Sequence, residues 1–318
     1  PIKSTALPYR EVKMKKEKTT DNKKIKKHRK DRKDGRWVKE ADAMHHFVPY
    51  LIPNRCDNEA LLQETFDMTE VVKYLEEKNA TVPEGGYRYT LFHVVSAALA
   101  KVIYHRPKLN YFIQGHRLYE RNNISFSFAM KKRFVDNADE GLCIIKVGEK
   151  GTVPIDDLYE KIKERVFTIR HHDETDGSTD IMEKLVKLPR FLLKFITHIL
   201  NFLDYHGWMP RSLSKDDPYY SSVFISNLGS IKLSANYHHL TNYGTNSFFL
   251  IINRMKKTPV FHEDGTFEMK DTLDLAVTID ERIADGLYFG NSIKLIKKIF
   301  ENPKILELPI ETPIDPVE

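Results

Sequence analysis

The sequence predicts a layered α/β fold, in which long helices pack on a mixed β-sheet. Three observations lead to this prediction. Long helical segments alternate with strand-like segments along the chain, and several of the strands show the period-two alternation of a half-buried sheet. In addition, 41% of the 318 residues are hydrophobic, which is enough for a sizeable core. Global disorder is therefore excluded.

The helices are recognised by apolar residues that recur every three to four positions. They are expected at residues 68–77, 91–106, 155–170, 181–205 and 290–300. Thr69 and Thr90 are the expected N-caps of the first two, because a threonine hydroxyl can accept from a free backbone N–H at a helix start. Pro107 ends the second helix. That helix is apolar nearly all round, so we expect it to be buried.

The strands are recognised by alternation and by short apolar runs between turns. They are expected at residues 123–130, 142–147, 222–226, 247–252, 259–262 and 273–279. The first of these places Ile124, Phe126, Phe128 and Met130 on one side. A Glu-Asp-Gly turn at residues 263–265 is expected to join two strands as a hairpin.

The segment 181–205 predicts a basic amphipathic helix that is bent or started at Pro189. Apolar side chains such as Leu192 and Phe195 share one face, while Lys187 and Lys194 lie on another. Such a helix suits a membrane surface or a partner helix. Packing on the domain's own core, or at an oligomer seam, is the alternative that we favour.

Positive charge is concentrated near the N-terminus. The chain has 50 Lys and Arg and 45 Asp and Glu. Residues 10–36 hold 14 of these bases and 5 of these acids, which gives this segment a net charge of +9. All other residues together have a net charge of −4. We expect a flexible basic arm at residues 1–35, one globular domain at 36–308 and a tail at 309–318. Nucleic acid or an anionic surface is a candidate partner of the arm. A solvated tail is favoured, because residues 10–36 lack the aromatics that stack on bases.

Other classes of protein are excluded by features that the sequence lacks. Two cysteines, Cys56 and Cys143, cannot form a disulfide framework in a chain of this length, so a reducing, cytoplasmic location is expected. No uninterrupted run of 18 apolar residues is present, and no transmembrane segment is expected. Histidines and cysteines nowhere show metal-ligand spacing, so no metal is expected. The His-His-Asp-Glu run at 171–174 is interpreted as a helix end and loop.

Two short segments carry the chemistry, since no phosphate-binding loop, dinucleotide fingerprint or nucleophile elbow is present. In residues 223–230, a strand ends in Ser226 and Asn227 and is followed by Gly229. This arrangement can present a hydroxyl and an amide at a sheet edge. Residues 278–286 contain Asp-Glu-Arg-Ile-Ala-Asp-Gly between a strand and the last helix. Polar groups at such a junction often form a site.

These segments resemble the catalytic domain of the dihydrolipoamide acyltransferases of 2-oxo acid dehydrogenase complexes and the related chloramphenicol acetyltransferases. The family carries a Phe-Thr-Ile-Ser-Asn-Leu-Gly strand and an Asp-His-Arg-x-x-Asp-Gly motif, matched here by residues 223–229 and, except at one position, by 280–286. The resemblance covers about residues 40–308, with 171–220 as a helical insertion. It implies a two-layer sandwich with a mixed sheet, assembled as a homotrimer with active sites between subunits.

The resemblance also assigns roles to residues. Ser226 would hydrogen-bond the tetrahedral oxyanion, and Asp285 would be structural, holding the motif through an ion pair. The acyl donor would be coenzyme A, or a lipoyl group on a separate protein, and the acceptor a small molecule. The family's catalytic histidine is replaced by Glu281.

This replacement decides how the activity is interpreted. An ordinary glutamate, with a pKa of about 4.3, is a poor base for a thiol unless burial raises that pKa. Pairing with Arg282 or Lys294 would prevent such tuning. His238 and His239 are candidate substitute bases or substrate contacts, although surface positions are the simpler interpretation. His93 is expected to be a satisfied core histidine or to line the pocket.

Two functions follow. The first is a coenzyme-A-dependent acyltransferase that uses Glu281, Ser226 and Asp285. The second is a catalytically inactive trimeric scaffold or binding protein of the same fold.

Overall fold

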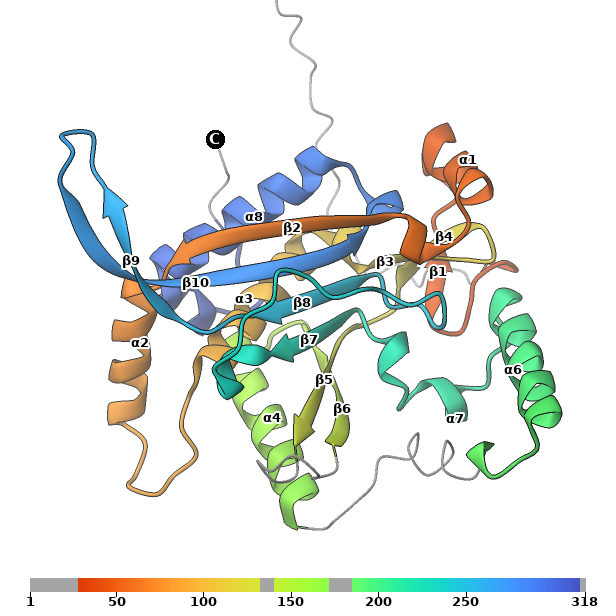
Figure 1. Cartoon of the computed structure of the whole chain (residues 1–318), viewed down its shortest axis with the longest axis horizontal. Helices are drawn as coiled ribbons and strands as arrows, with labels where there is room; N and C mark the ends of the chain where they lie inside the picture. The colour runs from red at the N-terminus through yellow and green to blue at the C-terminus, as the bar shows by residue number, and fades with distance from the viewer. Residues whose placement is uncertain (1–27, 132–139, 172–184, 315–318) are drawn as a thin grey trace, which may run out of the picture.

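The computed structural model describes residues 28–131, 140–171 and 185–314. Its centre is a seven-stranded sheet in the order β2-β10-β8-β7-β5-β6, with β9 paired to β10 (Figure 1). The strands are β2 (Glu59–Asp67), β5 (Ile124–Lys131), β6 (Glu140–Val147), β7 (Val223–Asn227), β8 (Phe248–Ile252), β9 (Lys256–Phe261) and β10 (Phe267–Asp280). β7 runs parallel to β5 and β8, whereas the other pairs are antiparallel. The predicted mixed sheet is confirmed.

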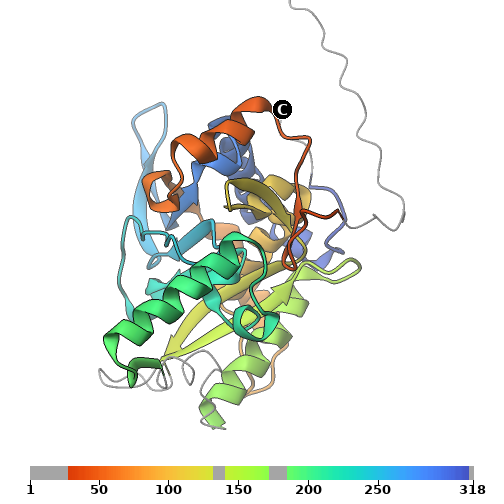
Figure 2. The ribbon, with the colours of Figure 1, turned by 90° about the vertical axis from the view of Figure 1, so that its right-hand side faces the viewer.

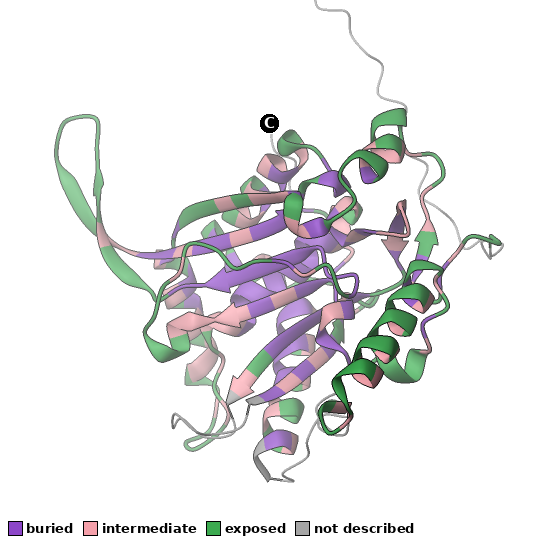
Figure 3. Cartoon of the chain, turned by 45° about the vertical axis from the view of Figure 1, so that its right-hand side comes forward, coloured by how far each residue is buried: buried purple, intermediate pink, exposed green. Residues whose placement is uncertain are grey.

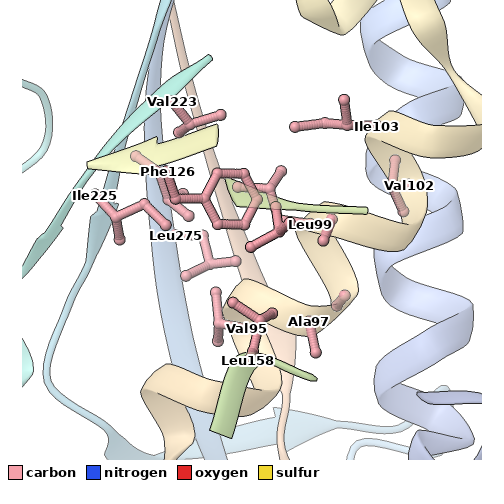
Figure 4. Packing of buried hydrophobic residues seen from close by; sticks show 14 of the residues in the cluster. Val95, Ala97, Leu99, Val102, Ile103, Phe126, Leu158, Val223, Ile225 and Leu275 are labelled. Atoms are coloured by element: carbon pink, nitrogen blue, oxygen red, sulfur yellow. The ribbon is translucent and has the colours of Figure 1, made fainter. Parts of the chain in front are cut away.

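Helices cover one face of this sheet and form the second layer. They are α2 (Thr69–Ala80), α3 (Leu91–His105), α4 (Pro154–His171) and α8 (Gly286–Glu301). α3 packs against both α4 and α8 and faces the sheet, which explains why its sequence is apolar nearly all round. The close-packed core lies between α3 and the central strands (Figure 4). It includes Val95, Leu99, Ile103, Phe126, Ile225 and Leu275.

A smaller part of the molecule sits at one end of the large sheet, on the right in Figure 1. It contains the antiparallel sheet β1-β4-β3 and three outer helices. Their bounds are β1 (Gly35–Trp37), β3 (Tyr111–Gln114), β4 (Arg117–Arg121), α1 (Ala43–Leu51), α6 (Arg190–Tyr205) and α7 (Arg211–Ser214).

The described end of the expected basic arm is packed onto this part. Arg32 is 5% exposed, and its Nη2 lies 2.7 Å from Oδ1 of Asp204 in α6. The folded body therefore begins before residue 35. Residues 1–27 of the arm, 172–184 of the expected insertion and 315–318 of the tail lie outside the described residues.

Several element boundaries follow the sequence prediction, and others differ for identifiable reasons. Thr90 is the N-cap of α3, and α6 begins directly after Pro189, both as predicted. Thr69 is not the cap of α2 but its first residue; its N–H and hydroxyl both donate to Asp67, at 2.9 and 2.6 Å.

The strand β2 was not expected. It is an edge strand whose side chains, apart from Phe66, stay partly or fully exposed, so the sequence shows no alternation there. In the described ranges, no helix combines the length and the hydropathy that crossing a bilayer requires.

Candidate functional site

Ser226 stands near the carboxyl end of β7, in the middle of the sheet. Val223 and Ile225 of this strand are buried against the helices, so the alternating Phe224 and Ser226 point to the opposite face. The Ser226 side chain is half-buried and forms no hydrogen bond with any residue that the structure describes. Its hydroxyl is therefore free to donate to a bound molecule.

A pocket of about 370 Å³ opens at this end of β5 and β7. Its polar lining includes Ser226, Asn227 and His93, which are far apart in the sequence. Its walls are mostly apolar and come from α3, α4, β5 and the turn after β7, including Phe92, Phe128, Met130, Ile162, Val166 and Leu228. The structure thus brings three of the sequence-predicted residues to one pocket that suits an apolar group.

His93 has an unusual environment within this pocket. It is 1% exposed, and burial lowers its pKa to about 4, so the ring is neutral at physiological pH. The Thr90 backbone N–H donates to Nδ1 at 3.0 Å, which places the remaining ring proton on Nε2. That Nε2 is buried without a hydrogen-bond partner among the described residues. The neutral His93 ring therefore has a hydrogen-bond donor, Nε2–H, without an acceptor among the described residues. Its other nitrogen, Nδ1, is already occupied, so the ring is not available as a base.

Gly229 has a packing role beside Ser226. It lies in the single turn of 3₁₀-helix at Leu228–Ile231 that directly follows β7. A Cβ added at this position would come within 2.7 Å of the Asn253 carbonyl oxygen. Glycine therefore allows the turn to lie against the end of β8, and its presence is explained without substrate contact.

His238 and His239 are exposed, as the simpler interpretation held. His238 stacks on Phe249 with a 4.2 Å separation of ring centroids, and Phe249 in turn stacks on Phe224. This row lies on the face of the sheet that carries Ser226. His238 is therefore near the Ser226 face but does not line the pocket.

Glu281 follows β10 and lies at the opposite end of the strands from Ser226. Ser226 pairs with Ile251 of β8, which pairs with Ala276 of β10, and Glu281 follows five positions later. With a rise of about 3.3 Å per residue and about 4.8 Å between strands, Ser226 and Glu281 are roughly 20 Å apart in one chain. The Glu281 side chain is exposed and forms no ion pair with Arg282, Lys294 or any other described residue. One chain alone does not bring this pair together.

The ion pair of this motif belongs to Asp280 and not to Asp285. Asp280 is fully buried and receives two 2.7 Å hydrogen bonds from the Arg282 guanidinium, while Arg55 Nε lies 3.7 Å from its Oδ2. Arg282 also donates to the carbonyl oxygens of Ile52 and Pro53. The Asp-x-Arg spacing in the sequence is a signal for the pair of Asp280 and Arg282. No sequence signal indicates that Arg55 joins them.

Asp285 instead begins α8 as its N-cap. Its carboxylate accepts from the Tyr288 N–H at 2.8 Å, which holds the pKa of Asp285 below its ordinary value. No described residue forms an ion pair with it. The role expected from the resemblance is thereby corrected: Asp285 shapes the loop after Glu281 through the helix start.

Metal ligands do not gather in the described ranges, where no group of three or more His, Cys, Asp or Glu side chains could hold an ion. Neither Cys56 nor Cys143 forms a disulfide within the part of the chain that the structure describes. Among the described residues, the unpartnered hydrogen-bond donor at this mostly apolar pocket is therefore the Ser226 hydroxyl, while His93 lines the pocket with its Nε2 buried.

Comparison with known proteins places this geometry in a family context. Residues 209–308 match the family model of the 2-oxoacid dehydrogenases acyltransferase (catalytic domain). The chain resembles these acyltransferases. It is 22% identical over 237 residues to the lipoamide acyltransferase component of the branched-chain alpha-keto acid dehydrogenase complex of Bacillus subtilis (strain 168). That match covers 74% of this chain but only 45% of the relative, so the chain spans less than half of that protein's length.

Solved structures show the same fold. A dihydrolipoamide acetyltransferase of Azotobacter vinelandii superposes with a TM-score of 0.55 at 15% identity, over 84% of this chain and 89% of that one. A probable dihydrolipoamide acetyltransferase of Listeria monocytogenes 4b F2365 superposes with a TM-score of 0.53 at 20% identity, over 80% of this chain and 88% of that one. A chloramphenicol acetyltransferase superposes with a TM-score of 0.52 at 12% identity, over 84% of this chain and 99% of that one. The chloramphenicol acetyltransferase-like fold predicted from the sequence is confirmed.

Proposed function

We propose that this protein is an acyltransferase that moves an acyl group between a coenzyme A or lipoyl thioester and a small thiol, hydroxyl or amine acceptor. The observation that carries the proposal is the Ser226 hydroxyl, which has no hydrogen-bond partner among the described residues and lies at a mostly apolar pocket within an acyltransferase-like fold. A serine, a histidine and an asparagine are the residues whose role in catalysis was investigated in the Azotobacter enzyme. Ser226 is the residue of this chain that we match to that serine.

In this proposal the acyl thioester lies with its carbonyl group at Ser226. The acceptor loses its proton to a base and attacks the carbonyl carbon, and the Ser226 hydroxyl donates to the oxygen on which negative charge develops. Collapse of the tetrahedral intermediate expels the thiolate, which takes up a proton. Asn227 and His93 line the same pocket, and Asn227 contributes an amide.

The base is assigned to Glu281 of a neighbouring copy of the chain, in a homotrimer. Support comes from the roughly 20 Å between Ser226 and Glu281 within one chain, which only a second subunit can bridge. His238, on the Ser226 face, is the substitute base to compare. The alternative function, an inactive trimeric scaffold, is supported by the carboxylate that stands in place of the expected histidine.

The activity is tested by incubating the full chain with acetyl-CoA and a panel of thiol, amine and hydroxyl acceptors. Release of free coenzyme A is followed spectrophotometrically, and binding by calorimetry. Removing one oxyanion donor through Ser226→Ala should lower kcat by about 100- to 1000-fold, with little change in KM. Ser214→Ala, on α7 and outside the pocket, is the matched control. If acyl-CoA is neither bound nor consumed, the proposed function is wrong.

The base and the shared site are tested together. Glu281→Gln should abolish activity if the carboxylate is the base, whereas a gain of activity in Glu281→His from an inactive parent supports the scaffold. The Ser226→Ala and Glu281→Gln chains are mixed in equal amounts, unfolded together and refolded together. About one quarter of the parent activity should return, because one quarter of the randomly assembled interfaces join an intact Ser226 to an intact Glu281. No restoration contradicts a site built from two chains.

A further inference from the structure

Helix α6 presents two apolar sides, of which only one is used by the fold. Leu193, Ile196 and Leu200 are half-buried against the body. A second stripe, formed by Phe191, Phe195, Ile199 and Phe202, faces away and is between 40% and 76% exposed. Figures 2 and 3 show the helix on the outside of the molecule with its outer side exposed. We call these four residues, together with Trp208, the α6 aromatic face.

This face is a large apolar surface that no described residue covers. Its spacing of i, i+4, i+8 and i+11 places the four helix residues on one narrow arc. Trp208, just after the helix, is 58% exposed and its ring lies edge-on to Phe202. At about 200 Å² for each aromatic side chain, the exposed part amounts to roughly 500 Å². This is the size of the largest apolar patch on a typical monomer, and such patches are often functional.

Basic side chains border the aromatic face. Arg190, Lys194 and His198 follow one another along the adjoining arc, and neither Arg190 nor Lys194 forms an ion pair with a described residue. The helix contains one acid, Asp204, which is 3% exposed and is held inward by Arg32 and by the Gln114 amide, 2.7 Å from its Oδ2. The outer side of α6 therefore carries positive charge that no described acidic side chain neutralises.

The helix is also presented in a fixed position. Besides the Arg32–Asp204 pair, its last residue rests on the β3–β4 turn, where Gly115 has φ +55° and an added Cβ would lie 2.3 Å from the Tyr205 carbonyl oxygen. Only glycine permits this approach. A partner would thus meet a helix that is already folded and anchored, so binding would carry no cost of ordering it.

We propose that the α6 aromatic face docks on the surface of an anionic lipid bilayer, with the helix lying in the interface. Aromatic and aliphatic side chains on one arc with basic residues beside them are the composition of interfacial helices. Phe191, Phe195 and Phe202 enter the boundary between headgroups and acyl chains, and Arg190 and Lys194 reach the lipid phosphates. Face-to-face pairing of this surface with the same surface of a second copy is disfavoured, because it would bring these unpaired cations together.

The test is sedimentation of the full chain with vesicles of phosphatidylcholine alone or with 30% phosphatidylglycerol. We expect retention on the anionic vesicles that weakens with salt. The double variant Phe195→Ser/Phe202→Ser should lose this retention, while Phe261→Ser/Phe267→Ser, an exposed aromatic pair on the β9–β10 hairpin, keeps it. Replacing Arg190 and Lys194 by glutamine should weaken binding by about 30-fold, from about 1 kcal/mol per basic residue.

A second readout is the fluorescence of Trp208 in a Trp37→Phe background, which leaves it as the sole tryptophan. Its emission should shift to the blue on anionic vesicles and be quenched by brominated lipids. Because the N-terminal basic segment is intact in every variant, unchanged retention of Phe195→Ser/Phe202→Ser overturns the proposal. The proposal is also overturned if the parent does not bind vesicles and the oligomeric mass changes in Phe195→Ser/Phe202→Ser. That result would identify the α6 aromatic face as a protein interface.

Discussion

Replacing His93 by glutamine removes a titrating group from the core while keeping its structural hydrogen bond. His93 is the third residue of α3, and its Nδ1 accepts from the Thr90 N–H. Glutamine at this position of a helix can accept the same bond, as in a capping box. We therefore expect His93→Gln to fold normally and to differ from the parent mainly in its response to acid.

The size of that response follows from the buried imidazole. Burial lowers the pKa of His93 from an ordinary 6.5 to about 4 in the folded protein. Below pH 6.5 the unfolded chain takes up a proton that the folded chain refuses, so stability is complete above pH 6.5 and is lost as the pH falls towards 4. Between pH 7.5 and 5 this single group costs about 2 kcal/mol, and the loss approaches about 3 kcal/mol below pH 4.

The assay is urea unfolding of the parent and of His93→Gln at pH 7.5 and 5. Other histidines, such as His105 with its lowered pKa, titrate in both proteins and cancel in the comparison. The parent should lose about 2 kcal/mol more than the variant over this interval. An equal loss in both proteins would show that His93 is not held neutral in the folded protein.

Two further predictions concern the motif after β10. Asp280→Asn should destabilise the protein by about 3 to 5 kcal/mol in urea unfolding, because it leaves Arg55 and Arg282 buried without their counter-charge. Asp271→Asn, at the exposed pair with Lys257, should cost less than about 1 kcal/mol, and similar losses in the two variants would contradict this ranking. Asp285→Ala should lower the free energy of unfolding by about 1 kcal/mol, because α8 loses its N-cap. Asp285→Asn should change it by only a few tenths of a kcal/mol, since asparagine also caps helices. Equal destabilisation by both variants would indicate that Asp285 acts through a charge partner instead.

Local patterns in the sequence predicted most of the central elements. Alternation in β5 and the all-round apolar composition of α3 are properties of neighbouring residues, and they gave both the element type and its burial. The same reasoning failed for β2, whose exposed edge position removes the alternation on which it depends. It also misplaced the start of α2, because Asp67, and not Thr69, accepts the free N–H there.

The candidate site was only partly predictable. Ser226 and Gly229 were found from a short motif, but the pocket that joins Ser226 to His93 depends on strand order and on where α3 packs. The resemblance indicated Asp285 as the paired carboxylate, whereas the structure pairs Asp280, because a sequence does not reveal which carboxylate will be buried beside Arg55.

The sequence by itself determined the types and approximate limits of the main helices and strands, the presence of the Ser-Asn-Leu-Gly strand and the carboxylate at position 281. These depend on interactions between residues close in the chain. The tertiary structure decided that Ser226 and Glu281 lie at opposite ends of the strands, because β8 runs parallel to β7 and β10 runs antiparallel to β8. It also decided which apolar side of α6 remains exposed, since a helix that is apolar on two sides can be oriented only by the contacts of residues such as Arg32 and Gly115.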